Sequence, residues 1–239
     1  MSGFAEVGGS FLREQARAPL NLVMLVVIPV FFVLIFASVL GEFAEALGGT
    51  LAEQSATSIS AGWAAAFLSG ALAFFQLSSS RGADRRLASA GLGPWRVAAA
   101  RIGASLALGL AVSAVAFTAL WLWSGIEHPL HAAVAIFAFA AIYIGVGALI
   151  GAFVSAPLEG SLLVVLVFSA DVFSGPAMTS NPSFGLSAFT PTRDAADLLI
   201  AAGGGQGSPA ADWIGVAAVA LGGLAVALGA FWLSARTRS

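Results

Sequence analysis

The sequence predicts an all-α integral membrane fold, with six transmembrane helices in a single domain over residues 1–239. Three observations support this prediction. Of the 239 residues, 59% are hydrophobic and only 9% are charged, whereas a soluble domain is about a quarter charged. Six apolar stretches approach or exceed the roughly 20 residues that cross a bilayer as a helix. All ten basic residues are arginines, and they gather in short segments around these stretches.

The spans can be placed from the apolar stretches. Pro29 lies midway along the first span and should kink it, because proline removes a helix hydrogen bond. Gly147 and Gly151 are four residues apart in the fourth span, a spacing that favours close helix packing. The six tryptophans, Trp63 among them, fall near predicted span ends, where an indole ring is favoured. The predicted spans are residues 20–40, 61–78, 97–123, 130–154, 158–173 and 213–234.

The arginines predict the orientation of the chain. Six spans place both chain ends on one side of the membrane, and only Arg193 falls on the other side. Because cytoplasmic segments collect arginine and lysine, we expect cytoplasmic N- and C-termini and a multi-pass protein of the cytoplasmic membrane. The nine arginines on the side of the termini are Arg13, Arg17, Arg81, Arg85, Arg86, Arg96, Arg101, Arg236 and Arg238.

Two segments outside the spans have patterns of their own. Residues 2–17 have amphipathic spacing, which predicts a helix lying in the cytoplasmic membrane interface, with no cleavable signal peptide. The long outer segment between the fifth and sixth spans is apolar enough in part to dip back into the membrane. Within it, Thr192 is expected to cap a short helix. The interface helix is expected to use Phe4, Phe11, Arg13 and Arg17.

The residues that would support an enzyme are missing from the pattern. There is no cysteine and no phosphate-binding GxxxxGK[ST] motif, and no histidine is expected inside the membrane to activate a nucleophile, since His128 and His131 flank the outer start of the fourth span. His128 and His131 stand near Glu127 in an outer loop, where a metal site is the less favoured reading. The net charge of −2 follows the membrane topology and indicates no nucleic-acid partner. We therefore expect a non-catalytic chain that binds no cofactor.

Acidic residues within spans often belong to ion or substrate pathways. Asp171 is near the outer end of the fifth span, and Glu159 is at its inner end. Both are candidate pathway residues. Glu159 also has a simpler explanation, because a carboxylate is favoured at a helix N-terminus.

The loop between the second and third spans reads RGADRRLASAGLGPWRVAAAR, from residue 81 to residue 101, and holds five of the ten arginines. Residues 82–90 can form a short helix outside the bilayer, anchored by Leu87. Glycine suits the end of that helix, and proline suits the first turn of the next. The candidate site residues in this loop are Arg81, Asp84, Arg85, Arg86, Leu87, Gly91, Pro94, Trp95 and Arg96.

This loop resembles the segment between the second and third spans in permease subunits of type 2 ABC exporters. Several further features follow in the same order along nearly the whole chain: an N-terminal interface helix leading into Arg17-Ala-Pro19-Leu20, six spans, an acid at Glu159, and Phe173-Ser174-Gly175-Pro176 before the outer segment. Asp171 departs from the family pattern, which is usually apolar at this point.

The resemblance implies the transmembrane subunit of an ATP-driven transporter. Residues 81–96 would then couple this chain to a separate ABC ATPase subunit, present in two copies, which would bind ATP and Mg²⁺. A second permease unit, identical or related, would complete the pathway among membrane lipids. The expected activity is export of a hydrophobic or amphipathic substrate.

Two other functions remain open from the sequence alone. An autonomous proton-coupled secondary transporter would use Asp171 and would need no ATPase partner. An intramembrane enzyme acting on lipid would need several Ser, His, Asp or Lys groups at one depth, and the sequence offers no such group.

Overall fold

The computed structural model of the chain describes residues 19–46, 53–87, 90–91, 93–175, 190–205, 207 and 209–236. Within these residues the protein is all-helical, and six helices are long and apolar enough to cross a membrane, which confirms the predicted fold class at this level. The predicted interface helix (2–17) and residues 176–189 of the outer segment lie outside the described residues. The six candidate spans are Val23–Phe43, Glu53–Ser79, Pro94–Ser124, Pro129–Phe153, Pro157–Ser174 and Ala210–Leu233.

The first span consists of three helical pieces. Helix α2 (Pro19–Phe31) contains Pro29, the π-helical turn η1 (Phe32–Phe36) follows directly, and α3 (Ala37–Ala46) continues the span. A π-turn is a local irregularity within an α-helix, so the span departs from regular geometry just after the proline. The Phe32 ring, which belongs to this turn, is near the rings of Phe67 and Phe168.

The second span begins earlier than the sequence predicts. Helix α4 runs from Glu53 to Ser79, whereas the expected start was residue 61. Its first turns are polar, and hydropathy therefore excludes them, yet Ser58 and Ser60 are buried. The short helix α9 (Arg193–Gly203) explains this burial, because its far end packs on α4 and Gln54 Nε2 donates a hydrogen bond to the Gly203 carbonyl at 2.9 Å.

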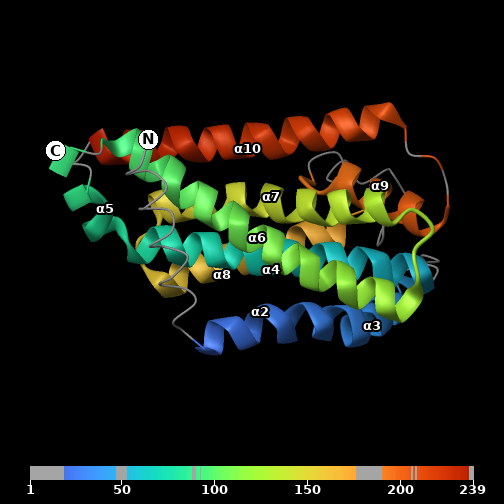
Figure 1. Cartoon of the computed structure of the whole chain (residues 1–239). Coiled ribbons are helices and arrows are strands. Elements are labelled where there is room, and N and C mark those ends of the chain that lie inside the picture. Colours follow the sequence, from blue (N-terminus) through green and yellow to red (C-terminus); the bar gives the residue numbers. More distant parts are fainter. Residues whose placement is uncertain are drawn as a thin grey trace.

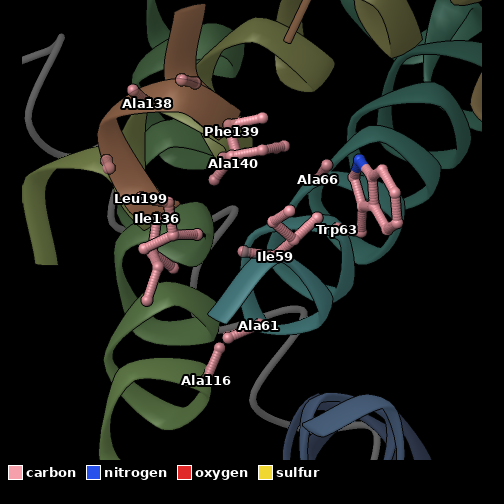
Figure 2. Close-up of a cluster of buried hydrophobic side chains, with 14 of the residues drawn as sticks. Ile59, Ala61, Trp63, Ala66, Ala116, Ile136, Ala138, Phe139, Ala140 and Leu199 are labelled. Atoms are coloured by element: carbon pink, nitrogen blue, oxygen red, sulfur yellow. The ribbon is translucent and has the colours of Figure 1, made fainter. Parts of the chain in front are cut away.

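Trp63 corrects another expectation. It does not lie at a membrane interface, because α4 extends ahead of it and its side chain is only 1% exposed. It belongs to the main core cluster together with Ile59, Phe139 and Leu199, which come from α4, α7 and α9 (Figure 2). By contrast, more than half of the Trp95 side chain is exposed.

The remaining spans begin at prolines or follow a polar turn. Proline suits the first helical turn, where its missing N–H would have no partner within the helix anyway. Helix α6 begins at Pro94, as the loop sequence predicts, and the residue before it is Gly93, with φ of 75°. These helices are α6 (Pro94–Ser124), α7 (Pro129–Phe153), α8 (Pro157–Ser174) and α10 (Ala210–Arg236).

Helix α7 lies at the centre of the bundle and packs against α4, α6, α8, α9 and α10. Its glycines bring other backbones close, as the four-residue spacing predicts. A Cβ atom at Gly147 would collide with the Gly70 carbonyl oxygen of α4, and one at Gly151 would lie 3.2 Å from the Phe74 carbonyl oxygen. On another side, a Cβ at Gly145 would lie 3.0 Å from the backbone of Gly223 in α10.

The loop helix α5 (Arg81–Leu87) stands at one end of the bundle, near the end of α10 (Figure 1), and packs against α6 and α4. Helix α9 stands at the opposite end (Figure 1). The arginine-rich loop and the outer segment therefore occupy opposite ends of the helices, which are long enough to separate them by a membrane.

Candidate functional site

The arginine-rich loop is held to the bundle by a buried ion pair. Asp84 of α5 is 3% exposed and Arg101 of α6 is 4% exposed. Arg101 donates from Nη2 and Nε to Oδ1 of Asp84, at 2.8 and 3.1 Å. The Ser80 hydroxyl lies 2.9 Å from the other carboxylate oxygen, Oδ2. Arg101 therefore pairs with Oδ1, as a charge removed from water requires. The single proton of the Ser80 hydroxyl is within reach of both Oδ2 and the Gln76 carbonyl oxygen, which is 2.6 Å away.

A second arginine ties the same loop to α7. Nη2 of Arg81 donates to the carbonyl oxygens of Gly151 and Val154, the latter at 2.7 Å. These carbonyls belong to the last turn of α7 and the residue that follows it, where backbone acceptors lack helical partners and a positive charge is favoured. The loop helix therefore contacts both α6 and the junction between α7 and α8.

The other candidate residues of the loop either pack on α6 or are exposed to the outside of the bundle. Leu87 packs on Ala100 and Ala104 of α6, as its predicted anchoring role requires. Arg86, Trp95 and Arg96 are exposed. Arg85 lies within α5, but its side chain is outside the described residues, and Gly91 has a φ of 104°. Pro94 starts α6 as predicted.

The loop residues of the prediction thus divide into two groups. Arg81 and Asp84 point into the protein and fasten the loop to neighbouring helices. Arg86 and Arg96 are exposed at the end of the bundle, where a partner surface can reach them. Helix α5 covers the first part of the predicted helix, and residues 88 and 89 lie outside the described residues. The interface-helix residues Phe4, Phe11, Arg13 and Arg17 lie outside the described residues.

The predicted pathway acids are at opposite ends of α8. Glu159 is exposed in the first turn of the helix, where a carboxylate is favoured by the helix dipole alone. Asp171 is 3% exposed near the last turn. Twelve residues of helix separate them by about 18 Å, so they do not form one site.

Asp171 is the centre of a second polar cluster. Its Oδ2 atom accepts hydrogen bonds from the Tyr143 hydroxyl of α7 and the Thr192 hydroxyl, both at 2.8 Å. Among the described residues, Oδ1 has no hydrogen-bond partner, and the only ion pair is the one between Asp84 and Arg101. The cluster can therefore accept a proton or a hydrogen-bond donor at Oδ1.

Thr192 has a different role from the one its sequence position suggests. It is the N-cap residue of α9, but its side chain makes no capping hydrogen bond. Its hydroxyl instead donates to Asp171, which fastens the start of α9 to α8. The other end of α9 is fixed by Gln54, and by the His128 N–H, which donates to the Ala202 carbonyl at 3.3 Å.

The outer histidines do not assemble a metal site. The His128 and His131 rings are 5.5 Å apart, and His131 is equally far from the Trp213 ring. Within the described residues, no group of three or more metal-ligating side chains is present.

Two sets of candidate functional residues were not predicted from the sequence. Tyr143 was passed over because a single tyrosine in an apolar span carries no pattern. The polar stripe on α6 does carry one: Arg101, Ser105, Gly109 and Ser113 recur at every fourth residue, so they share one helix face. All four are buried.

The sequence matches no protein-family model, and no curated protein matches it. The interpretation of the arginine-rich loop and of the Asp171 cluster therefore rests on the residues and contacts described above.

Proposed function

We propose that this chain is the transmembrane subunit of an ATP-driven ABC transporter that exports a hydrophobic or amphipathic substrate. The observation that carries the proposal is the attachment of α5. An arginine-rich helix at one end of a membrane bundle, fixed to α6 by the Asp84–Arg101 pair and to α7 by Arg81, suits a part that receives force from a partner.

Energy for transport would come from outside this chain. In our proposal, two ABC ATPase subunits bind ATP and Mg²⁺ at the end of the bundle that carries α5. A second permease unit, identical or related, lies beside the first in the cytoplasmic membrane. The role of this chain is therefore non-catalytic.

Docking would rely on the exposed positive charge. Arg86 and Arg96 are exposed at the α5 end, and a surface of one sign attracts a partner surface of the other. The partner would therefore present carboxylates to α5. Closure of the ATPase pair would push on α5, whose buried ion pair gives it little freedom to move independently of α6.

Purification in detergent tests the proposal, with the co-purifying subunits identified by mass. We expect an ATP-binding subunit in about equal amount, lost when Arg85→Glu and Arg86→Glu are combined. The matched control is Arg193→Glu, which changes the same charge at the opposite end of the bundle. A chain that purifies alone, and whose transport follows the proton gradient, would contradict the proposal.

A second candidate function rests on the Asp171 cluster. A buried carboxylate with one unpartnered oxygen among the described residues suits a proton carrier. In that case the chain would be a proton-coupled secondary transporter, and Asp171→Asn would abolish transport. If the chain is instead the ABC transporter subunit that we propose, the side chain at residue 171 still accepts hydrogen bonds from Tyr143 and Thr192 in this variant, and ATP-driven transport is retained.

A further inference from the structure

Polar residues lie along the contact between α4 and α6, beginning at α5, and all of them except Ser69 are joined by side-chain contacts. We call this set of residues the polar seam and define it as Asp84, Ser80 and Gln76 with Arg101, Ser105 and Ser69. Its hydrogen bonds either join two helices, as between Arg101 and Asp84, or lie within one helix and the residue after it, as between Ser80 and Gln76. The seam is a feature of the bundle interior, since all but Ser80 are at most 5% exposed.

The first half of the seam starts at the loop helix. Arg101 of α6 holds Asp84 of α5, and the Ser80 hydroxyl lies 2.9 Å from Asp84 Oδ2 and 2.6 Å from the Gln76 carbonyl oxygen. This hydroxyl therefore links the end of α4 to the ion pair. Three helices meet in one hydrogen-bonded group at the end of the bundle.

The second half runs deeper between the two spans. The Ser105 hydroxyl of α6 donates to Gln76 Oε1 of α4 at 2.7 Å. One further turn along, Ser69 Oγ would lie 3.4 Å from a Cβ atom at Gly109, so the helices remain in close contact there. The seam therefore extends from α5 into the middle part of the spans.

Packing alone does not explain these residues. Within the described part of the chain, Gln76 Nε2 and Ser69 Oγ are buried without a hydrogen-bond partner. Such groups weaken a helix contact relative to apolar side chains of similar size. Polar contacts have another effect: because a hydrogen bond is directional, it restricts the relative position of two helices more narrowly than apolar contacts do.

The contacts that α8 and the first span make with Phe67 of α4 are of another kind. Phe32 and Phe168 meet the Phe67 ring of α4 through aromatic contacts, with ring centres 6.2 and 5.0 Å away. Among the described residues, we find no side-chain hydrogen bond between the first span (α2, η1 and α3) and α4. Apolar surfaces of this sort can slide with small loss of contact energy, whereas the seam cannot.

We propose that the polar seam joins α5 and the inner halves of α4 and α6 into one rigid body, with Arg101, Gln76 and Ser105 as its positioning residues. Displacement of α5 is then carried to the middle of the membrane at the level of Ser69. The rigid body is a property of this chain; its use in transport rests on the proposed function.

Distance measurement between two spin labels tests the rigid body directly. The chain has no cysteine, so Ala83→Cys on α5 and Leu110→Cys on α6, both exposed positions, can be labelled uniquely. We expect one narrow distance distribution in the full-length protein. It should broaden when Asp84→Leu is combined with Arg101→Met and, separately, when Gln76→Leu is combined with Ser105→Ala. Arg101→Lys, which keeps the charge, should preserve the narrow distribution.

Each paired change removes both partners, so no buried charge or amide oxygen is left without its partner and the fold is retained. Distributions as narrow as that of the parent protein in both paired variants would overturn the rigid body, whether or not an ATPase partner exists.

ATP hydrolysis and transport by the same variants test the use of the seam. If an ATPase subunit co-purifies, both paired variants should retain it and hydrolyse ATP with loss of transport, and Arg101→Lys should transport. Full transport by the paired variants would overturn the coupling role. Failure of any ATPase to co-purify with the parent chain would instead overturn the proposed function, while the distance distributions still decide the rigid body.

Discussion

At the scale of single residues, charge burial dominates the two candidate sites. Asp84 and Arg101 pair with each other, and the Ser80 hydroxyl lies near the other carboxylate oxygen. Removing one member of a buried pair leaves an uncompensated charge, whereas replacing both by apolar residues is often nearly neutral. The ion pair should therefore show strong non-additivity.

We predict that Asp84→Ala lowers the free energy of unfolding by about 3–5 kcal/mol, because Arg101 is then buried without its partner. Asp84→Leu with Arg101→Met should lie within about 1.5 kcal/mol of the parent chain. Thermal unfolding in detergent measures both. Arg96→Met, at an exposed position, is the control and should change stability by no more than about 0.5 kcal/mol. Additive effects of the two pair members would contradict the prediction.

Asp171 makes a similar prediction for the outer helix. Asp171→Leu removes the acceptor for Thr192 and should loosen the start of α9. A single added cysteine, Leu199→Cys on the buried face of α9, reports this by its reaction rate with a thiol reagent. We expect the rate to rise by up to about tenfold, since a side-chain hydrogen bond contributes about 0.5–1.5 kcal/mol.

Asp171→Asn is the matched control for this experiment, because the amide oxygen still accepts from both hydroxyls. It should label at nearly the parent rate. Equal labelling of the Leu and Asn variants would show that the cluster does not hold α9.

Asp197 of α9 gives a pH-dependent prediction. Burial raises the pKa of its carboxyl, Arg193 lowers it, and Asp212 and Asp194 raise it further, with a net increase. A carboxyl with a raised pKa in the folded protein binds its proton more tightly when folded, so stability falls as the pH rises through the interval above about 4. In the parent chain the melting temperature should fall as the pH rises from about 4 to about 7, and in Asp197→Asn this fall should be smaller. An unchanged pH profile in this variant would contradict the assignment.

At the scale of elements, glycines determine how closely α7 approaches its neighbours. Gly147→Ala places a methyl group against the Gly70 carbonyl oxygen, and backbone on both sides leaves little room to adjust. We predict a loss of about 1–3 kcal/mol in the free energy of unfolding. Gly229→Ala on α10 is the control, because nothing lies within 4 Å of its added Cβ. That variant should be neutral or more stable by up to about 1 kcal/mol. A loss at Gly229 equal to that at Gly147 would contradict this explanation.

The elements also show what sequence patterns can and cannot predict. Hydropathy located all six spans, because length and apolar content are summed along the chain. It missed the start of α4, since Ser58 and Ser60 are buried only through α9, a contact distant in sequence. Trp63 was misplaced for the same reason.

The candidate site was predictable to a similar extent. The arginine loop, Leu87 as its anchor and Pro94 at the next helix follow from local chemistry. The partner of Asp84 does not, because the fold of the turn decides which arginine of the loop reaches it. The four-residue stripe from Arg101 to Ser113 was visible in the sequence and would have indicated a polar helix face.

At the scale of the whole molecule, the two sites lie at opposite ends of the bundle (Figure 1). The α5 end carries the exposed Arg86 and Arg96, and the α9 end carries Arg193 together with Asp194, Asp197 and Asp212. This separation agrees with an arginine-rich cytoplasmic side.

The predicted orientation can be measured with two single-cysteine variants. Ala83→Cys on α5 should react with a membrane-impermeant maleimide only after intact cells are opened. Leu130→Cys, an exposed position at the start of α7, should react in intact cells. The reverse pattern would overturn the topology.

The most direct test of the central claim, that α5 docks a separate ATPase, is cross-linking from α5 itself. Ala83→Cys would carry a photoreactive maleimide in membranes from the native host, with Leu130→Cys as the matched outer position. Subunits joined to the chain would be identified by mass. We predict an ATP-binding subunit joined to residue 83 and absent at residue 130. No ATP-binding subunit at residue 83, in membranes where the chain still transports, would contradict the claim.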